Sequence, residues 1–258
     1  MTSRTIGVSL KMYFGHQRTL DWCAEVAELA RRHPAVRGGG AELFVLPSFP
    51  GLAPALELFR DTPVEVGAQD LFWADHGAYT GEVSGAELRE LGCSHVEVGH
   101  AERRRLFGED DPVVAAKTAA ALRNGLTPVL CLGEEQAGGS TDAVRTCLEQ
   151  LDSALSRARE ADRLGAVVVA YEPQWAIGAA EPADPEFIGA VCGELRSALD
   201  AEPVLAGSRV IYGGSAGPGL LSTLGDAADG LFLGRFAHDP AALEQILDEV
   251  VALGGVTA

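Results

Sequence analysis

The stretch VVVAYEPQWAIG, residues 167–178, places one carboxylate, that of Glu172, between a run of β-forming residues and a segment rich in Pro, Trp and Gly. A run such as VVVA predicts a strand that is buried on both faces. An ionised glutamate buried without a partner costs several kcal/mol of folding free energy. The presence of Glu172 at the end of this strand therefore needs a structural or functional explanation.

Similar runs of β-branched and apolar residues recur along the chain, and most are separated by segments with helical spacing. Such spacing is seen in residues 19–32, 112–125 and 185–199, and the last segment opens with a Pro just inside the expected helix start. The eight candidate strands are TIGVSL (5–10), AELFVLP (41–47), VEVGAQ (64–69), HVEVGH (95–100), TPVLCLG (127–133), AVVVAYE (166–172), RVIYGG (209–214) and GLFLG (230–234).

This alternation of strand and helix decides the predicted fold. Parallel βα units need both faces of the sheet covered, which explains the nearly continuous apolar character of the strands. A count of eight favours a closed (β/α)8 TIM barrel over an open sheet. A doubly wound sheet is the alternative, but the chain has no GxGxxG after the first strand and no Pro-, Gly- or Ser-rich linker. We expect a single α/β domain over residues 1–258.

The composition argues against several classes of partner. The chain has 258 residues, of which 47% are hydrophobic, and a formal net charge of -17. This charge disfavours binding to nucleic acid or to an anionic membrane. No apolar run reaches the roughly 18 residues of a membrane span, and the N-terminal residues lack the layout of a signal peptide. We expect a cytoplasmic protein with no nucleic-acid or membrane partner.

The sequence does not indicate metal or redox chemistry. Its five cysteines are scattered without a CxxC pair, and we expect most of them to be small buried hydrophobic residues. No cluster of His, Asp and Glu has ligand spacing on one element. We therefore expect neither a metal nor a cofactor.

Polar residues follow the ends of several predicted strands. In a barrel of this kind the catalytic groups lie at the C-terminal ends of the strands, which explains a charged residue at position 172. The same rule selects residues after the first, third, fourth, seventh and eighth strands. These are Lys11, Gln69, His100, the segment 213–215 and the pair 234–235. We expect them to converge on one mouth of the barrel.

A carboxylate, an imidazole and an ammonium group around one cavity suit proton abstraction next to a carbonyl. Glu172 would take the proton, His100 would polarise the oxygen and Lys11 would stabilise the negative charge. Two alternatives stay open from these residues alone: His100 as a hydrogen-bonded core histidine and Lys11 as a solvated loop cation. The joint placement of the three at strand ends favours the catalytic interpretation.

The glycines after the last two strands indicate a second feature, an anion site. YGGS (212–215) and FLGRF (232–236) lie where barrels often build a phosphate site from loop amides and a helix N-terminus. Gly lets main-chain N–H groups approach an anion closely. The main-chain donors would come from Gly214, Ser215, Gly234 and Arg235. The alternative is that these segments are only tight turns.

Taken together, these segments resemble the triosephosphate isomerase family along essentially the whole chain. The matching segments are LKM (10–12), GAYTGEVS (77–84), VEVGHAERRRLFGE (96–109), CLGE (131–134), AYEPQWAIG (170–178), YGGS (212–215) and DGLFLG (229–234). The resemblance implies that Glu172 moves a proton between adjacent carbons, while His100 serves the two oxygens of an enediolate and Lys11 stabilises its charge.

The resemblance also assigns supporting residues. Glu102 and Arg103 look like the family's supporting ion pair, and Gly178 would lie in a flexible lid that closes over the phosphate. Thr80 resembles the residue that reaches into the neighbouring subunit's site, which implies a homodimer. Cys131 matches a cysteine common in the family, and we interpret it as packing near the base.

Three positions depart from the family pattern. The usual Asn two residues before the lysine is Ser9, the usual Ser after the catalytic His is Ala101, and the lid tip reads AAEPAD (179–184). The stretch GAQDLFWADHGAYTGE (67–82) resembles more closely the branch that includes erythrulose-1-phosphate isomerases. That branch acts on a substrate one carbon longer.

We therefore predict a cofactor-free isomerase that acts on a short phosphorylated sugar through an enediolate. Its substrate would be the three-carbon pair of glycolysis, dihydroxyacetone phosphate and glyceraldehyde 3-phosphate, or a four-carbon homologue. L-Erythrulose-1-phosphate isomerase activity is one alternative. A paralogue that binds a phosphometabolite without catalysis is the other, and it is motivated by Ser9, Ala101 and the altered lid.

Overall fold

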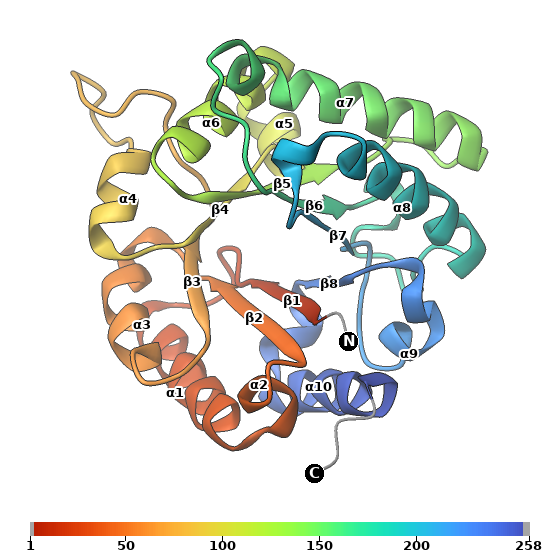
Figure 1. Ribbon diagram of the computed structural model, residues 1–258. Coiled ribbons are helices and arrows are strands. Elements are labelled where there is room, and N and C mark those ends of the chain that lie inside the picture. Colours follow the sequence, from red (N-terminus) through yellow and green to blue (C-terminus); the bar gives the residue numbers. More distant parts are fainter. Residues whose placement is uncertain (1–2, 255–258) are drawn as a thin grey trace.

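Eight parallel strands close into a barrel in the computed structural model, which describes residues 3–254 (Figure 1). The strands are β1 (Arg4–Ser9), β2 (Ala41–Leu46), β3 (Glu65–Ala68), β4 (His95–Val98), β5 (Thr127–Leu132), β6 (Val168–Tyr171), β7 (Arg209–Tyr212) and β8 (Gly230–Leu233). Val8 of β1 lies opposite Val45 of β2 on one side and Leu233 of β8 on the other. This double pairing of β1 closes the sheet, so the predicted barrel is confirmed and the open-sheet alternative is wrong.

Helices surround the barrel (Figure 1). The predicted helices correspond to α1, α6 and α8, and the last two begin with an aspartate cap followed closely by Pro. The α-helices are α1 (His16–Arg32), α2 (Pro34–Arg37), α3 (Leu52–Phe59), α4 (Gly85–Leu91), α5 (Ala101–Phe107), α6 (Asp111–Arg123), α7 (Ser140–Glu160), α8 (Pro185–Asp200), α9 (Leu220–Leu224) and α10 (Pro240–Gly254). The short 3-10 helices are η1 (Phe49–Gly51), η2 (Gln174–Ala176), η3 (Pro203–Leu205), η4 (Gly225–Ala227) and η5 (Arg235–His238). No helix within residues 3–254 is long and apolar enough to cross a membrane.

The core has two parts, because alternate residues of each strand face opposite sides of the sheet. Val96 and Val98 belong to the large cluster shared with the helices. A smaller cluster contains Phe44, Leu46, Val129, Cys131, Val168, Ala170, Ile211 and Phe232. The ring of His95 stacks on that of Phe44 in this second cluster, with 4.5 Å between centroids. His95 and Glu97 alternate with these two valines along β4. They are polar, and both are buried on the face of the sheet opposite to the valines.

All eight strands end one or two residues earlier than predicted, and the early ends of β4 and β6 place two site residues. β4 ends at Val98 because Gly99 turns the backbone with φ +76, and His100 then becomes the N-terminal cap of α5. β6 ends at Tyr171, although the amide of Glu172 still donates to the carbonyl of Leu132. Both side chains are thus carried at the exit of a strand.

Candidate active site

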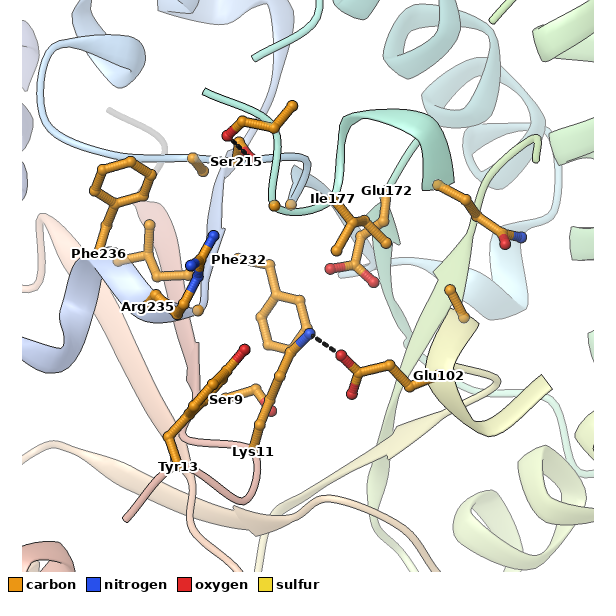
Figure 2. Close-up of a pocket in the computed structure, with 18 of the residues that line it drawn as sticks. Ser9, Lys11, Tyr13, Glu102, Glu172, Ile177, Ser215, Phe232, Arg235 and Phe236 are labelled. Carbon is orange, nitrogen blue, oxygen red and sulfur yellow. Dashed lines mark hydrogen bonds and ion pairs between the residues drawn. The ribbon is translucent and has the colours of Figure 1, made fainter. Parts of the chain in front are cut away.

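A cavity of about 730 Å³ opens at the C-terminal ends of the strands. It brings together residues from five regions that are distant in the sequence (Figure 2). Of the residues predicted from sequence, those lining it are Ser9, Lys11, Glu102, Glu172, Gly178, Ser215, Gly234 and Arg235. The convergence expected from the strand-end rule is seen for Lys11, Glu172, Gly213, Ser215, Gly234 and Arg235, whereas Gln69 and His100 do not line the cavity.

His100 and Glu172 meet at the edge of this cavity, which Glu172 lines and His100 does not. The Nε2 atom of His100 lies 3.5 Å from the Oε2 atom of Glu172, and both side chains are buried. The backbone N–H of Glu102 donates to Nδ1 of His100 over 3.1 Å, so in the neutral imidazole the proton is on Nε2. Neither Nε2 nor Oε2 has a hydrogen-bond partner among residues 3–254. A buried donor and a buried acceptor, both without a hydrogen-bond partner, therefore lie side by side at this point.

Lys11 is held beside this pair by a strained backbone. Its φ of +49 is unusual for a residue with a side chain, and such strain is typical of functional sites. The side-chain amide of Gln69 donates to the carbonyl oxygens of Lys11, over 3.0 Å, and of Leu46, over 2.9 Å. Burial acts to lower the pKa of Lys11, but the carboxylates of Glu172 and Glu102 outweigh it and raise the pKa. Lys11 thus stays charged at neutral pH.

Glu102 is the ion-pair partner of Lys11. Its Oε1 atom lies 2.9 Å from Nζ of Lys11 (Figure 2). Burial acts to raise the pKa of Glu102, but the hydrogen bond and the charge of Lys11 prevail and lower it. The pair links the loop after β1 to the start of α5.

The expected ion pair between Glu102 and Arg103 is not formed. Arg103 instead binds Asp70 over 2.9 Å and Glu109 over 2.6 Å, and Lys117 binds the same two carboxylates. Neighbouring residues on a helix point in different directions, so Glu102 faces the cavity while Arg103 faces α6. Arg103 therefore braces α5 from outside the cavity.

The loop after η2, residues 177–184, is bound to the loop after β7. The single hydroxyl proton of Ser215 is shared between the carbonyl oxygens of Ala176, at 2.8 Å, and Ala179, at 3.0 Å. The hydroxyl of Tyr212 accepts from the amide of Ala183 over 3.0 Å. Gly178 turns the loop with φ +77. These contacts hold the predicted lid against the wall of the cavity.

The two glycines that follow β7, Gly213 and Gly214, have different structural roles. A β-carbon at Gly213 would lie 2.7 Å from Cγ of Glu172, so the close approach of this carboxylate requires glycine. Gly214 does not line the cavity, and a β-carbon there would meet the Tyr212 hydroxyl at 2.5 Å. The expectation of a direct ligand contact from Gly214 is therefore not supported.

Arg235 contributes its side chain to the cavity. We expected only main-chain donors from this residue, but Figure 2 shows its guanidinium within the pocket, on the side of Ser215 and Phe236. No carboxylate of residues 3–254 forms an ion pair with it. Together with Lys11 and Arg105, it supplies positive charge to a cavity in a strongly acidic protein.

The family model for triosephosphate isomerase matches residues 4–250. The chain belongs to the triosephosphate isomerase family. It is 60% identical over 255 residues to the L-erythrulose-1-phosphate isomerase of Pectobacterium atrosepticum, covering 98% of both chains. It is 39% identical to the triosephosphate isomerase of Solibacter usitatus, over 80% of this chain and 85% of that one. The L-erythrulose-1-phosphate isomerase of Rhizobium rhizogenes is 38% identical, over 96% of this chain and 94% of that one. The protein is thus a sugar-phosphate isomerase of this family.

Besides Arg103, two more residues selected by resemblance to the triosephosphate isomerase family lie outside the cavity. Cys131 is buried in the barrel, where burial raises the pKa of its thiol well above the ordinary value. Thr80 is exposed in the loop between β3 and α4, which projects from the side of the barrel (Figure 1). Within this single chain Thr80 does not contribute to the cavity.

Glu97 is a buried residue of the site that was not predicted from the sequence. Glu97 lies on β4 and is buried, with one oxygen 2.9 Å from the Ser9 hydroxyl and the other 3.9 Å from Nε2 of His100. Burial raises the pKa of the Glu97 carboxyl. The signal was present as a charged residue in the middle of the apolar run HVEV, residues 95–98.

Proposed function

We propose that this protein is an L-erythrulose-1-phosphate isomerase, which interconverts four-carbon ketose phosphates. The observation that carries the proposal is the small size of two residues that line the cavity, Ser9 and Ala101. They leave room beside His100 and Glu172 for one more hydroxymethyl group than a triose phosphate carries. The names of two of the similar family members support the same substrate.

In the proposed reaction, Glu172 is the base. It removes a proton from the hydroxyl-bearing carbon next to the carbonyl, and the electrons of that C–H bond form an enediolate. The same carboxyl then returns the proton to the former carbonyl carbon. His100 donates from Nε2 to the two oxygens in turn and Lys11 stabilises their negative charge. This division of roles fits the 3.5 Å contact between His100 and Glu172 and the free Nε2 and Oε2 atoms.

The phosphate group would bind at the side of the cavity formed by the loops after β7 and β8. Ser215 and Gly234 line that side and offer main-chain donors, and Arg235 adds a guanidinium. A dianion approaching a protein with a net charge of -17 needs such local donors. Closure of loop 177–184 over the phosphate would exclude water from the enediolate.

The proposal includes a homodimer of single-domain chains that works in the cytoplasm. Large apolar side chains are exposed around the projecting loop and the cavity mouth: Met12 is 92%, Phe107 67% and Tyr79 46% exposed. Exposed apolar surface of this kind is typical of an interface between subunits. Thr80 lies next to Tyr79 and would enter the neighbouring site.

The test is steady-state isomerisation by the purified protein after treatment with a chelator. L-Erythrulose 1-phosphate is compared with dihydroxyacetone phosphate as substrate. We expect a higher kcat/KM for the four-carbon ketose. A preference for dihydroxyacetone phosphate would replace the proposal with a triosephosphate isomerase, and turnover of neither substrate would favour a binding protein.

A further inference from the structure

A carboxylate lies inside the barrel directly below the cavity. Glu97 is 4% exposed, and its neighbours across the interior include Cys131, whose Sγ atom lies 3.9 Å from Oε1. Burying a carboxylate among apolar side chains is costly unless it is hydrogen bonded. The one hydrogen bond shorter than 3 Å that it receives within residues 3–254 comes from Ser9. Ser9 therefore supplies the shortest hydrogen bond to this carboxyl, and the charge of Lys11 also acts on it.

This contact fixes the orientation of the Ser9 hydroxyl. Ser9 donates its only hydroxyl proton to Oε2 of Glu97 over 2.9 Å. A hydroxyl has one proton and two acceptor lone pairs, so its lone pairs are left for other partners. Ser9 lines the cavity and Glu97 does not. The Ser9 hydroxyl oxygen therefore acts as a hydrogen-bond acceptor in the cavity wall.

The acceptor lies beside the reacting groups. Glu97 Oε1 is 3.9 Å from Nε2 of His100, which itself contacts Glu172. Figure 2 shows Ser9 next to Lys11, on the side of the pocket away from Ser215. A substrate whose phosphate lies near Ser215 would thus extend its other end toward Ser9.

We propose that Ser9 and Glu97 form the subsite for the terminal hydroxymethyl group of a four-carbon ketose phosphate, with Glu97 as the positioning residue that orients the Ser9 hydroxyl. This inference rests on the proposed function. The terminal hydroxyl of the substrate donates to Ser9, and a triose phosphate lacks the group that makes this contact. Sites that hydrogen-bond a substrate hydroxyl discriminate against analogues without it.

The experiment compares kcat/KM for L-erythrulose 1-phosphate with kcat/KM for dihydroxyacetone phosphate in five proteins. These are the unaltered chain, Ser9→Ala, Glu97→Val, Glu97→Gln and the control Glu65→Gln. Glu65 is also a strand glutamate, but it lies on β3 at the opposite end of the barrel. We expect the ratio of the two constants to fall about tenfold in Ser9→Ala and in Glu97→Val, mainly through a higher KM for the four-carbon substrate.

Rescue by Glu97→Gln separates a positioning role from a structural one. The amide oxygen of Gln still accepts from Ser9, so the ratio should return to within about threefold of its original value. Equal losses for both substrates in Ser9→Ala and Glu97→Val would overturn the inference while leaving the proposed function intact. If Glu97→Val does not fold, the kcat/KM ratio of Ser9→Ala is the test of the inference, because this variant lacks only a single oxygen atom. An unaltered protein that turns over neither substrate would overturn both.

Discussion

The Nε2 atom of His100 lies 3.5 Å from the Oε2 atom of Glu172, although 72 positions separate them in the chain. Each atom is buried and lacks a hydrogen-bond partner among residues 3–254. One is a donor and the other an acceptor, as acid–base chemistry on two neighbouring carbons requires.

Replacing Glu172 by Gln keeps the shape of the side chain and removes the base. We expect kcat to fall by about 10³-fold, the usual range for a general base, while binding of inorganic phosphate is retained. Steady-state kinetics and calorimetric titration measure the two quantities. Glu135→Gln, at an exposed position, is the matched control. Turnover within tenfold of the original value would show that Glu172 is not the base.

Replacing Lys11 by Met removes the cation that faces Glu172. We expect kcat/KM to fall about 100-fold or more, because the enediolate loses a buried positive charge. The ion pair with Glu102 is also lost, but it is partly exposed and contributes little to stability. The thermal unfolding midpoint should therefore change little. Arg37→Met, on the surface, controls for the loss of a charge, and retained activity in Lys11→Met would contradict the assigned role.

Replacing Arg235 by Ala tests the guanidinium at the phosphate side. A charge-assisted hydrogen bond to phosphate is worth about 1.5–3 kcal/mol, so we expect KM to rise at least tenfold with a smaller change in kcat. The affinity for inorganic phosphate should weaken in parallel. Arg163→Ala removes an exposed arginine elsewhere. If both variants have the same KM, Arg235 does not bind the phosphate.

His95 should make the protein sensitive to mild acid. Burial lowers the pKa of His95 to about 4, against about 6.5 in an unfolded chain. Between these values the unfolded state binds the proton and the folded state does not, so stability falls as the pH decreases through this window. Linkage gives a loss of about 2–3 kcal/mol between pH 7 and pH 4.5. Urea unfolding at the two pH values should show a smaller loss in His95→Gln, and an equal loss would refute the assignment.

The exposed loop between β3 and α4 should mediate self-association. We expect sedimentation equilibrium to give twice the chain mass for the unaltered protein. Tyr79→Asp places a charge in the proposed interface and should give monomers with reduced activity. Val204→Asp, which alters another exposed apolar side chain on η3, should remain dimeric. Dimers in both variants would place the interface elsewhere.

The fold was predictable because its signals are local. Eight apolar runs and the intervening helical spacing describe units that pack only in a few ways, and the ends of parallel strands then meet at one mouth. His100 and Glu172 could be placed there for this reason. The partner of Arg103 was not predictable, because the rotation of a helix about its axis decides whether a side chain meets the cavity or the neighbouring helix.

The sequence by itself determined the eight strands, three of the helices, the closed barrel and the set of residues carried at the strand ends. These follow from spacings of two to four residues and from steric limits on βα connections. Only the tertiary structure decided that Ser9 meets Glu97 across the barrel, and that the side chain of Arg235 enters the cavity. Such contacts depend on strand register and on side-chain direction between distant segments, and no local pattern encodes them.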